Sequence, residues 1–594
     1  MKTRSAGAAS RPGAPLPMRA RSFRARAAAP AVEGARATTA AQDAAAAAAA
    51  ERAPATPPPL PPYKNLPGRR VSVVALGCPK NTTDAETLLG DLQRQGFDVV
   101  GDDHASADAI IVNSCAFVED AKNESLEAIV AAATLGGEDG RRRKVVVTGC
   151  LAQRYGAQLA ESLPEADLIM GFEHYDALGA SLGLLLDQQR AEAEAEGAAA
   201  AAPLASAPAA AASGKKPAAA AGKKSQKGAS AAAKAAEVAA AIGLVDGEND
   251  GGTTATATTT AAPPLPLPRR VQVGSATVPF RSEAERYRLG PAHSAYLRIA
   301  EGCDCGCTFC SIPSFRGAFR SKPYPQLLDE ARALAATGVK ELCVIAEDTN
   351  LYGTDRRDGK TLATLLRDLS LIEGVAWIRL LYCYPSAWPD DLVEEIATNA
   401  KVCKYIDIPL QHSDNLVLLA MARPPAAHTR AVLDKLRARV PDLALRTTFI
   451  CGFPGESELQ HRELLQFVKD RRFERMGAFA YSEEEGTVAA GMDGRVAPRE
   501  RRRRRDALVA AQHAIQCEWA EGLVGREVDV IVDGVNEDGW LVGRTQWDAP
   551  DVDPCVFVAP PREGSGVKPA EVGEVRRCLV TGASLFDLEA YPVA

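Results

Sequence analysis

The chain of 594 residues has no apolar run of membrane-spanning length outside its alanine-rich tracts, which are weakly hydrophobic and interrupted by charges. We therefore expect a soluble protein without a membrane partner. It also lacks a large charge excess, because the formal net charge is −7 at pH 7, and this gives no global sign of nucleic-acid binding. The 14 cysteines do not form the pattern of a disulfide framework. Most lie within or after apolar strand-like runs, which suits a reducing compartment and metal ligation.

Two segments have a composition that does not support a packed core. Residues 1–32 contain seven basic residues and no acid, with much alanine. This is typical of an organelle transit peptide, so we expect 1–68 to be a targeting segment and tail, with the chloroplast stroma favoured over the mitochondrial matrix. The alternative is an arm without an address on a cytoplasmic protein. We assign 188–288, mostly alanine at its start, to a solvated insertion or linker, with a lysine-based partner-binding arm as the alternative.

Four cysteines lie close together in Glu301-Gly-Cys-Asp-Cys-Gly-Cys-Thr-Phe-Cys310. Cys303, Cys307 and Cys310 have the spacing C-x3-C-x2-C, and three thiolates on a short loop can hold three irons of a [4Fe–4S] cluster. The fourth iron then stays open for a substrate. A zinc knuckle is the alternative, but zinc usually takes paired C-x2-C units and four protein ligands. No second pair lies nearby, so the spacing favours the cluster.

The first folded part, at 69–187, has three apolar runs separated by segments of helical periodicity. This predicts an open α/β domain with a parallel sheet. Each run is closely followed by a cysteine, namely Cys78, Cys115 and Cys150. Ligands of open α/β sheets bind beyond the carboxyl ends of the strands, so we expect the three thiols to converge on a second three-thiolate site. Ordinary packing explains one such cysteine but does not account for three in the same topological position.

The second folded part, at 289–519, alternates strand-like and helix-like segments. Strands are expected at 295–300, 340–345, 376–382, 405–408, 443–450 and 476–480, and helices at 325–337, 360–369, 390–399, 429–440 and 456–471. This predicts a parallel sheet curved into a partial (β/α)6 barrel, with the cysteine loop at the end where barrel active sites lie. The third part, at 521–591, has short β runs separated by Gly, Asp and Pro, which predict a small antiparallel β-barrel.

These motifs together resemble the methylthiotransferases of the radical S-adenosylmethionine (SAM) superfamily, which combine a three-cysteine N-terminal domain, a radical SAM core and a C-terminal TRAM domain. The resemblance covers 69–187 and 289–591. Within the family, the chain is most similar to the branch that modifies an aspartate of ribosomal protein uS12. The residues that favour this branch are Gly77-Cys-Pro-Lys-Asn81, Ile312-Pro-Ser-Phe-Arg-Gly317, Pro409-Leu-Gln-His412, Leu445-Arg-Thr-Thr-Phe-Ile450, Gly452-Phe-Pro-Gly-Glu456 and Gly543-Arg-Thr-Gln-Trp-Asp-Ala-Pro550.

The resemblance implies two [4Fe–4S] clusters and SAM as cofactors. One cluster binds SAM, whose one-electron cleavage leads to removal of hydrogen from the β-carbon of the aspartate. The other delivers sulfur, and a second SAM provides the methyl group. The ligands implied are Cys78, Cys115 and Cys150 for the sulfur-delivering cluster, and Cys303, Cys307 and Cys310 for the SAM-binding cluster. The implied partners are uS12 in the small ribosomal subunit and a reductase or ferredoxin-type electron donor. Such chemistry at an unactivated carbon requires cofactors.

Further site residues are expected from the same resemblance. Gly452 and Gly455 follow a strand where backbone approaches SAM closely, and a plain turn explains them equally well. The expected pocket residues are Asp348, Thr349, Gln411 and His412. Three features depart from the family pattern: Cys305 within the cysteine loop, Glu347 where the family commonly has Gln, and the long insertion.

Three functions stay open from the sequence: modification of uS12, modification of a tRNA adenosine near the anticodon, and a non-catalytic iron–sulfur scaffold or RNA-binding protein. The six family cysteines count against the scaffold, and the TRAM sequence favours the protein substrate. The arginines at 501–505 are either a solvated helix face or a contact for ribosomal RNA phosphates. The remaining cysteines are assigned to packing: Cys343, Cys383, Cys403, Cys451, Cys517, Cys555 and Cys578.

Overall fold

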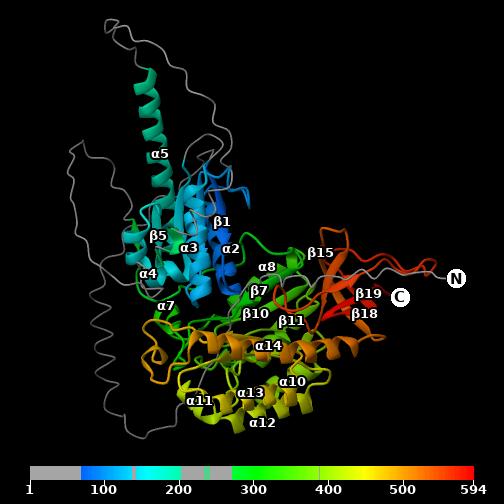
Figure 1. Ribbon diagram of the computed structural model, residues 1–594. Coiled ribbons are helices and arrows are strands. Elements are labelled where there is room, and N and C mark those ends of the chain that lie inside the picture. The colour runs from blue at the N-terminus through cyan, green and yellow to red at the C-terminus, as the bar shows by residue number, and fades with distance from the viewer. Residues whose placement is uncertain are drawn as a thin grey trace, which may run out of the picture.

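The computed structural model describes residues 69–136, 142–201, 234–236, 238–239, 270–386 and 388–593. Three folded units follow one another along the chain, and Figure 1 shows the N-terminal unit above the larger central unit, with a small β unit at its side. The expected targeting segment at 1–68 lies outside the described residues. In the described part of the chain, none of the helices combines the length and apolar character needed to span a bilayer.

The N-terminal unit is built on a six-stranded sheet with the order β2-β1-β3-β4-β5-β6, in which all strand pairs are parallel. The strands are β1 (Arg70–Ala75), β2 (Asp98–Val99), β3 (Ala109–Ser114), β4 (Lys144–Thr148), β5 (Leu168–Met170) and β6 (Val271–Gln272). The helices are α2 (Pro79–Arg94), α3 (Glu119–Thr134), α4 (Gly149–Ser162), η1 (Phe172–Ala177) and α5 (Leu178–Ala201). Every residue of β3 is buried, as expected for a parallel strand that helices cover on both faces. The predicted open α/β architecture is confirmed.

The central unit contains a second six-stranded parallel sheet, with the order β14-β13-β12-β11-β10-β7. Its strands are β7 (Ser294–Arg298), β10 (Glu341–Ile345), β11 (Trp377–Leu380), β12 (Val402–Asp407), β13 (Ala444–Cys451) and β14 (Arg475–Ala480). The helices that connect them are α8 (Tyr324–Ala336), α9 (Leu362–Ser370), α10 (Asp390–Thr398), α12 (Ala426–Arg439) and α13 (Glu458–Arg471). Each predicted strand and helix is present, with boundaries that shift by a few residues.

Shorter elements lie near the carboxyl ends of these strands. They are β8 (Ala300–Glu301) paired with β9 (Arg320–Ser321), α7 (Pro313–Arg316), η2 (Thr349–Leu351), α11 (Asn415–Ala420) and η3 (Ala489–Gly491). Local sequence explains several helix starts. Thr361 and Thr364 form a capping box at α9, and Ser457 and Gln460 form one at α13. The long helix α14 (Pro498–Glu521) begins with proline, whose missing N–H costs nothing at that position.

The C-terminal unit is a closed five-stranded barrel with the order β15-β16-β17-β19-β18. Its strands are β15 (Glu527–Val535), β16 (Leu541–Thr545), β17 (Val556–Val558), β18 (Val575–Ser584) and β19 (Asp587–Pro592). The sequence predicts an antiparallel barrel, but β17 and β19 pair in parallel while the other pairs are antiparallel. The reason is geometric, since a closed ring with an odd number of strands cannot alternate direction throughout.

This small barrel shares its core with the central unit. Tyr405 and Trp377 of the central sheet belong to the same buried cluster as Val530 and Ile531 of β15. The segment 543–553 enters the central sheet near the amino ends of its strands, where Arg379 donates to the carbonyl of Gln546 at 2.8 Å. The C-terminal unit therefore closes this end of the central sheet, opposite to the cysteine loop.

The stretch 188–288, expected to be a solvated linker, contributes described parts to the fold. The helix α5 extends to Ala201, and β6 pairs with β5 at the edge of the N-terminal sheet. Ala235, Val238 and Ala239 are buried in the core of the N-terminal unit. An alanine-rich sequence gives little periodic signal, because small side chains bury a helix face without a strong apolar stripe.

Candidate functional site

Cys78, Cys115 and Cys150 meet at the carboxyl edge of the N-terminal sheet. Cys78 precedes α2, Cys115 directly follows β3, and Cys150 lies in the first turn of α4. The backbone of Gly77 has φ +86°, and a Cβ there would lie 2.9 Å from the sulfur of Cys115, so glycine allows the two loops to touch. Burial raises the pKa of Cys115, and the nearby sulfurs of Cys150 and Cys78 raise it further. The structure thus brings together the three thiols that the topology predicts to converge.

Asn81 ties these strand ends to one another. Its amide nitrogen donates to the carbonyls of Ser114 at 2.8 Å and Leu76 at 3.1 Å. Its amide oxygen lies 3.4 Å from the sulfur of Cys150. Asn113 in turn donates to the carbonyl of Asn81 at 2.6 Å. One asparagine therefore fixes the relative positions of the loops that carry the three cysteines.

The donor set suits a cluster better than a single ion. In the described residues, no three His, Cys, Asp or Glu side chains are close enough together to hold one metal ion. A [4Fe–4S] cluster places each thiolate on a different iron, so its ligands stand farther apart and are all sulfur. Three thiols on three strand ends meet that requirement, whereas a structural zinc site needs four ligands around one point.

The cysteine loop lies at the carboxyl end of β7, clamped on both sides. Gly302 has φ +73°, and a Cβ there would come within 2.0 Å of the carbonyl oxygen of Ala318. The N–H of Cys303 donates to the carbonyl of Gly317 at 2.9 Å. Thr308 donates to Met421 and Ala420 beside α11, and accepts from the N–H of Ala489. The loop that would present three thiolates is therefore rigidly held.

Cys305 points toward the other thiols of this loop. Its sulfur lies 2.8 Å from the sulfur of Cys303. Burial raises the pKa of Cys305, and its contacts with Cys303 and Cys307 add to that effect. Burial alone would raise the pKa of Cys307 as well, but the hydrogen bond with Cys305 and the Arg423 guanidinium lower it below its usual value. Cys305, which departs from the family pattern, thus lies among the expected cluster ligands.

A pocket lies between the two cysteine sites. It is lined by Phe117 and Val118 of the N-terminal unit, Phe309 of the cysteine loop, and Gln411, Thr448 and Tyr481 of the central sheet, among others. Gln411 Oε1, Thr448 Oγ1 and the Tyr481 hydroxyl are buried, and each lacks a hydrogen-bond partner within the described residues. Buried polar atoms are normally satisfied, so these three indicate a polar ligand. SAM, with its amino-acid and adenosine groups, suits such a lining.

The other expected pocket residues serve different purposes. The Thr349 hydroxyl donates to the carbonyl of Leu381 at 2.5 Å and its N–H to Tyr382 at 3.1 Å, so Thr349 joins the β10 and β11 loops. Asp348 is buried beside it, next to Tyr384. His412 faces the outer helices, where its charged neighbours are Asp414, His461 and Arg504. Gln411 alone among the four lines the pocket.

Gly452 and Gly455 form a turn that accommodates the helix α14. Gly452 has φ +77°, and a Cβ there would clash with the side chain of Arg501 at 2.4 Å. The N–H groups of Gly452 and Phe453 donate to one carboxylate oxygen of Glu456, and Gly455 N–H donates to the carbonyl of Gly494 at 2.8 Å. The structure thus gives Gly452 a packing role, which agrees with the alternative of a plain turn.

Sequence reasoning missed the charged residues that join the N-terminal and central units. Lys80 reaches into the central unit, where its ammonium lies 3.6 Å from the ring centre of Tyr382, 3.1 Å from the carbonyl of Ala346 and 3.5 Å from Glu347. On another part of this interface, Lys122 pairs with Glu484 at 2.9 Å. Lys80 lies in a quoted motif, but the partners of both lysines are hundreds of positions away, so no local pattern reveals the contact.

Four of the five arginines at 501–505 form ion pairs within the protein. Arg501 pairs with Glu483 at 2.8 Å and Arg504 with Glu456 at 3.2 Å, and both arginines are buried. The more exposed Arg503 pairs with Glu458 and Glu500, and Arg505 pairs with Asp506. Their main role is to hold α14 against the turn after β13.

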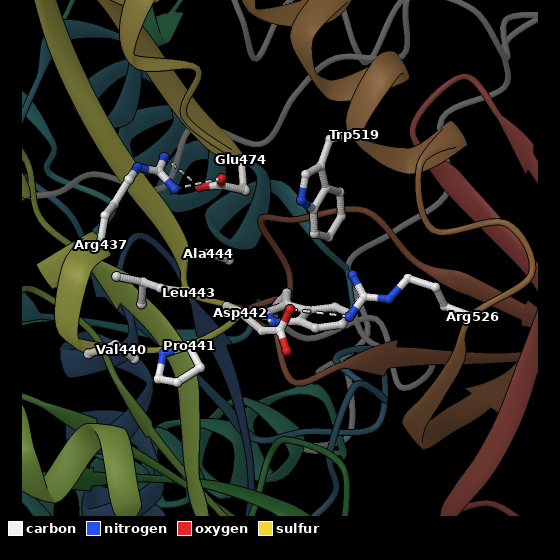
Figure 2. A pocket seen from close by; sticks show the side chains of 10 residues that line it. Arg437, Val440, Pro441, Asp442, Leu443, Ala444, Glu474, Trp519 and Arg526 are labelled. Atoms are coloured by element: carbon white, nitrogen blue, oxygen red, sulfur yellow. Dashed lines mark hydrogen bonds and ion pairs between the residues drawn. The ribbon is translucent and has the colours of Figure 1, made fainter.

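A separate groove lies at the opposite end of the central sheet, between α14 and the C-terminal unit. Figure 2 shows Arg437 beside Glu474 and Arg526 beside Asp442, with Trp519 at the edge of the groove. These charges are paired, at 2.9 Å for Arg437 and Glu474 and at 3.2 Å for Arg526 and Asp442. The residues that line this groove include no sequence neighbour of the six expected cysteine ligands, whereas Phe309, which lines the pocket, is next to Cys310.

Comparison with known families agrees with the three units. Residues 70–171 match the family described as Uncharacterized protein family UPF0004, residues 297–468 match the Radical SAM superfamily, and residues 524–593 match the TRAM domain. Among solved structures, the radical SAM methyltransferase TsrM from Kitasatospora setae aligns over 69% of this chain and 72% of that chain, with 15% identity and a TM-score of 0.41.

Curated relatives match nearly the whole chain. The ribosomal protein uS12 methylthiotransferase RimO of Geobacter sulfurreducens is 36% identical over 522 residues, covering 87% of this chain and 97% of the relative. The protein of the same name from Anaeromyxobacter sp. (strain K) is 38% identical over 528 residues, covering 88% and 93%. With matches to all three family models and to relatives over most of its length, the chain belongs to the radical SAM methylthiotransferases, the enzyme family that includes these RimO proteins.

Proposed function

We propose that the protein adds a methylthio group to the β-carbon of an aspartate in ribosomal protein uS12, using two [4Fe–4S] clusters and SAM. The observation that carries this proposal is the pocket between two sulfur-only sites on separate units. One wall is Phe117, two residues after Cys115, and another is Phe309 within the cysteine loop. A side chain in this pocket would lie beside both cysteine-bearing segments. The choice of uS12 rests on the name that the relatives carry.

The residues of the central unit would hold SAM and shield it. Cys303, Cys307 and Cys310 would bind one cluster, and Cys78, Cys115 and Cys150 the other. When bound, these groups supply hydrogen removal, sulfur and methyl, which no side chain can provide. Gln411, Thr448 and Tyr481 offer unused hydrogen-bonding atoms that would orient the ligand. The rings of Phe309, Phe453 and Tyr481 form edge-to-face pairs at 6.5 and 5.4 Å beside the cysteine loop, and this apolar wall would exclude water.

The substrate assignment is tested by mass spectrometry of a strain that lacks this protein. Peptides of uS12 and digested tRNA are both examined. We expect the methylthio group to disappear from one aspartate of uS12, with tRNA unchanged. Loss from a tRNA adenosine instead would overturn the substrate, although the fold and the cofactors would stand.

An electron-donating partner follows from this chemistry. The one-electron cleavage of SAM requires a donor, and we propose a reductase or a ferredoxin-type protein. Reduced ferredoxin should support formation of 5′-deoxyadenosine by the reconstituted enzyme, and a failure of several such donors would contradict this choice.

A contact with ribosomal RNA is a further proposal. Arg502 is the residue proposed for this RNA contact, because it is exposed and has no ion pair within the described residues. R502E should then lower activity on assembled small subunits more than on free uS12, and equal losses would contradict the contact.

We also propose that residues 1–68 direct the protein to an organelle, with the chloroplast stroma favoured over the mitochondrial matrix. The support is the composition of 1–32, with seven basic residues and no acid. A fluorescent protein fused behind residues 1–68 should enter the organelle and lose the segment by cleavage. A cytoplasmic signal from the fusion would contradict the assignment.

A further inference from the structure

Arg316 connects the two cysteine sites. It is the last residue of α7, six positions after Cys310, and its side chain is only 2% exposed. The helix α7 packs on α4, the helix that carries Cys150. A residue supplied by the loop of one cysteine site thus lies against a ligand of the other.

The guanidinium of Arg316 uses its donors on groups of both units. Nη2 lies 3.6 Å from the sulfur of Cys150, 2.8 Å from Asn81 Oδ1 and 2.7 Å from Asp84 Oδ2. Nη1 lies 3.4 Å from Glu301, the residue two before Cys303. The plane stacks over the ring of Phe172 at 4.6 Å. Such a set of contacts leaves the side chain one position, which fixes the charge beside Cys150.

The neighbouring Arg298 provides the contrast that gives this contact meaning. It is also buried, and it pairs with the same Asp84 and Glu301, as well as Glu283. Within the described residues, the hydrogen bonds of Arg298 go to carboxylates and not to a thiol. Arg298 therefore contributes a cation to the carboxylate network alone. Arg316 contacts two of the same carboxylates and, in addition, the sulfur of Cys150. The second cysteine site repeats the arrangement, since Arg423 lies 4.0 Å from the sulfur of Cys307.

We propose that Arg316 is a positioning residue for the sulfur-delivering site: it holds the Cys150 thiolate and raises the reduction potential of the cluster bound there. A positive charge and N–H donors at a ligating sulfur stabilise the more negative, reduced cluster. The low polarity of a buried site strengthens this effect. The inference rests on the proposed function, because it assumes that Cys78, Cys115 and Cys150 hold a [4Fe–4S] cluster.

The test uses the full-length protein with Cys303, Cys307 and Cys310 changed to alanine, so that only the sulfur-delivering cluster is loaded. Iron, sulfide and an EPR-monitored redox titration are measured for this parent and for R316M, R316K and R298M made in it. We expect R316M to have a lower midpoint potential than the parent and R298M to keep the parent value. R316K keeps a charge but has one nitrogen on a shorter side chain in place of Nη1 and Nη2, so its potential should lie between those of R316M and the parent. An unchanged potential in R316M and R316K, or an equal shift in R298M, would overturn the role of Arg316.

A second readout uses the enzyme with all six cysteines. R316M should still form 5′-deoxyadenosine, while the ratio of methylthio product to 5′-deoxyadenosine falls roughly tenfold, the usual size of an effect from a residue that orients a ligand. R316K should restore part of the ratio and R298M should keep it. Loss of both products in equal proportion would indicate a merely structural residue and overturn the proposal. If the parent in the first experiment binds no cluster at all, the proposed function fails, and this inference with it.

Discussion

Cys305 is the residue in which the cysteine loop departs most from the family pattern, and its sulfur lies 2.8 Å from that of Cys303. On the proposed function, Cys303, Cys307 and Cys310 would already complete a ligand set with one open iron. We therefore expect C305S to keep the iron content and SAM cleavage of the wild-type protein, whereas C303S loses both. An iron assay and chromatography of 5′-deoxyadenosine measure the two properties. Loss of iron from C305S would identify Cys305 as a ligand.

His412 is buried as a neutral imidazole, in which Nδ1 accepts the N–H of Asp414 at 3.0 Å. Burial lowers the pKa of His412 to about 3, whereas a histidine in an unfolded chain has a pKa of about 6.5. Between these values the unfolded chain binds the extra proton. The stability that the neutral ring contributes is therefore present above about pH 6.5 and is lost as the pH falls toward 3.

Replacement of His412 by asparagine keeps an acceptor for Asp414 and removes this titration. Urea unfolding of the metal-free protein at pH 7.5 and pH 5.5 should show a smaller loss of unfolding free energy in H412N than in the wild type. The difference between the two proteins should approach ~1.4 kcal/mol for each pH unit below the unfolded-state pKa. Equal losses in the two proteins would mean that His412 does not resist protonation.

Secondary structure and both cysteine sites could be predicted from the sequence of this chain. The spacing C-x3-C-x2-C marks the cysteine loop. The apolar runs mark the strands of both parallel sheets, and the rule that ligands lie beyond strand ends predicts that Cys78, Cys115 and Cys150 converge. Contacts between distant segments have no such signal. Arg316 meets Asp84 across 232 positions, and Arg544 meets Glu341 across 203. Which arginine faces sulfur and which faces only carboxylates is decided by packing between units.

The segment 543–553 illustrates how one element joins two units. Asp548 accepts from Arg475 of β14 and from the hydroxyl of Thr545, and its side chain is 3% exposed. Removal of one partner leaves the other charge buried and unpaired. We expect D548A to lower the unfolding free energy by about 3–5 kcal/mol, with a corresponding drop in the thermal midpoint followed by tryptophan fluorescence. D329A, which breaks the exposed pair of Asp329 with Arg332, is the control and should change the midpoint little. Equal midpoints for D548A and D329A would contradict this role of the segment.

At the scale of the whole molecule, we expect catalysis to require that the N-terminal unit stays packed against the carboxyl ends of the central strands. The pocket takes its walls from both units, and buried ion pairs hold them together, Lys80 with Glu347 and Lys122 with Glu484. On the proposed function, sulfur delivery would depend on this contact, because the N-terminal unit would hold the sulfur-delivering cluster and the central unit would hold SAM. Reductive cleavage of SAM would depend on the central unit alone. The two activities should therefore respond differently when the interface is weakened.

K80M removes the cation that pairs with the buried Glu347, at a cost of up to about 3–5 kcal/mol to the interface. K122M removes one of the two cations that pair with the buried Glu484, because Arg154 also lies 3.0 Å from that carboxylate, so its cost should be smaller. We expect both variants to retain 5′-deoxyadenosine formation while the yield of methylthio product per 5′-deoxyadenosine falls. K435M serves as the control, because Lys435 pairs with the exposed Asp390 on the outer helices and should keep the yield. If K80M alone lowers the yield, Arg154 is sufficient to hold Glu484 at the interface, and Lys80 makes the larger contribution. If neither variant does, the units stay together through their apolar contacts, and the ion pairs serve only to satisfy charges that the interface buries.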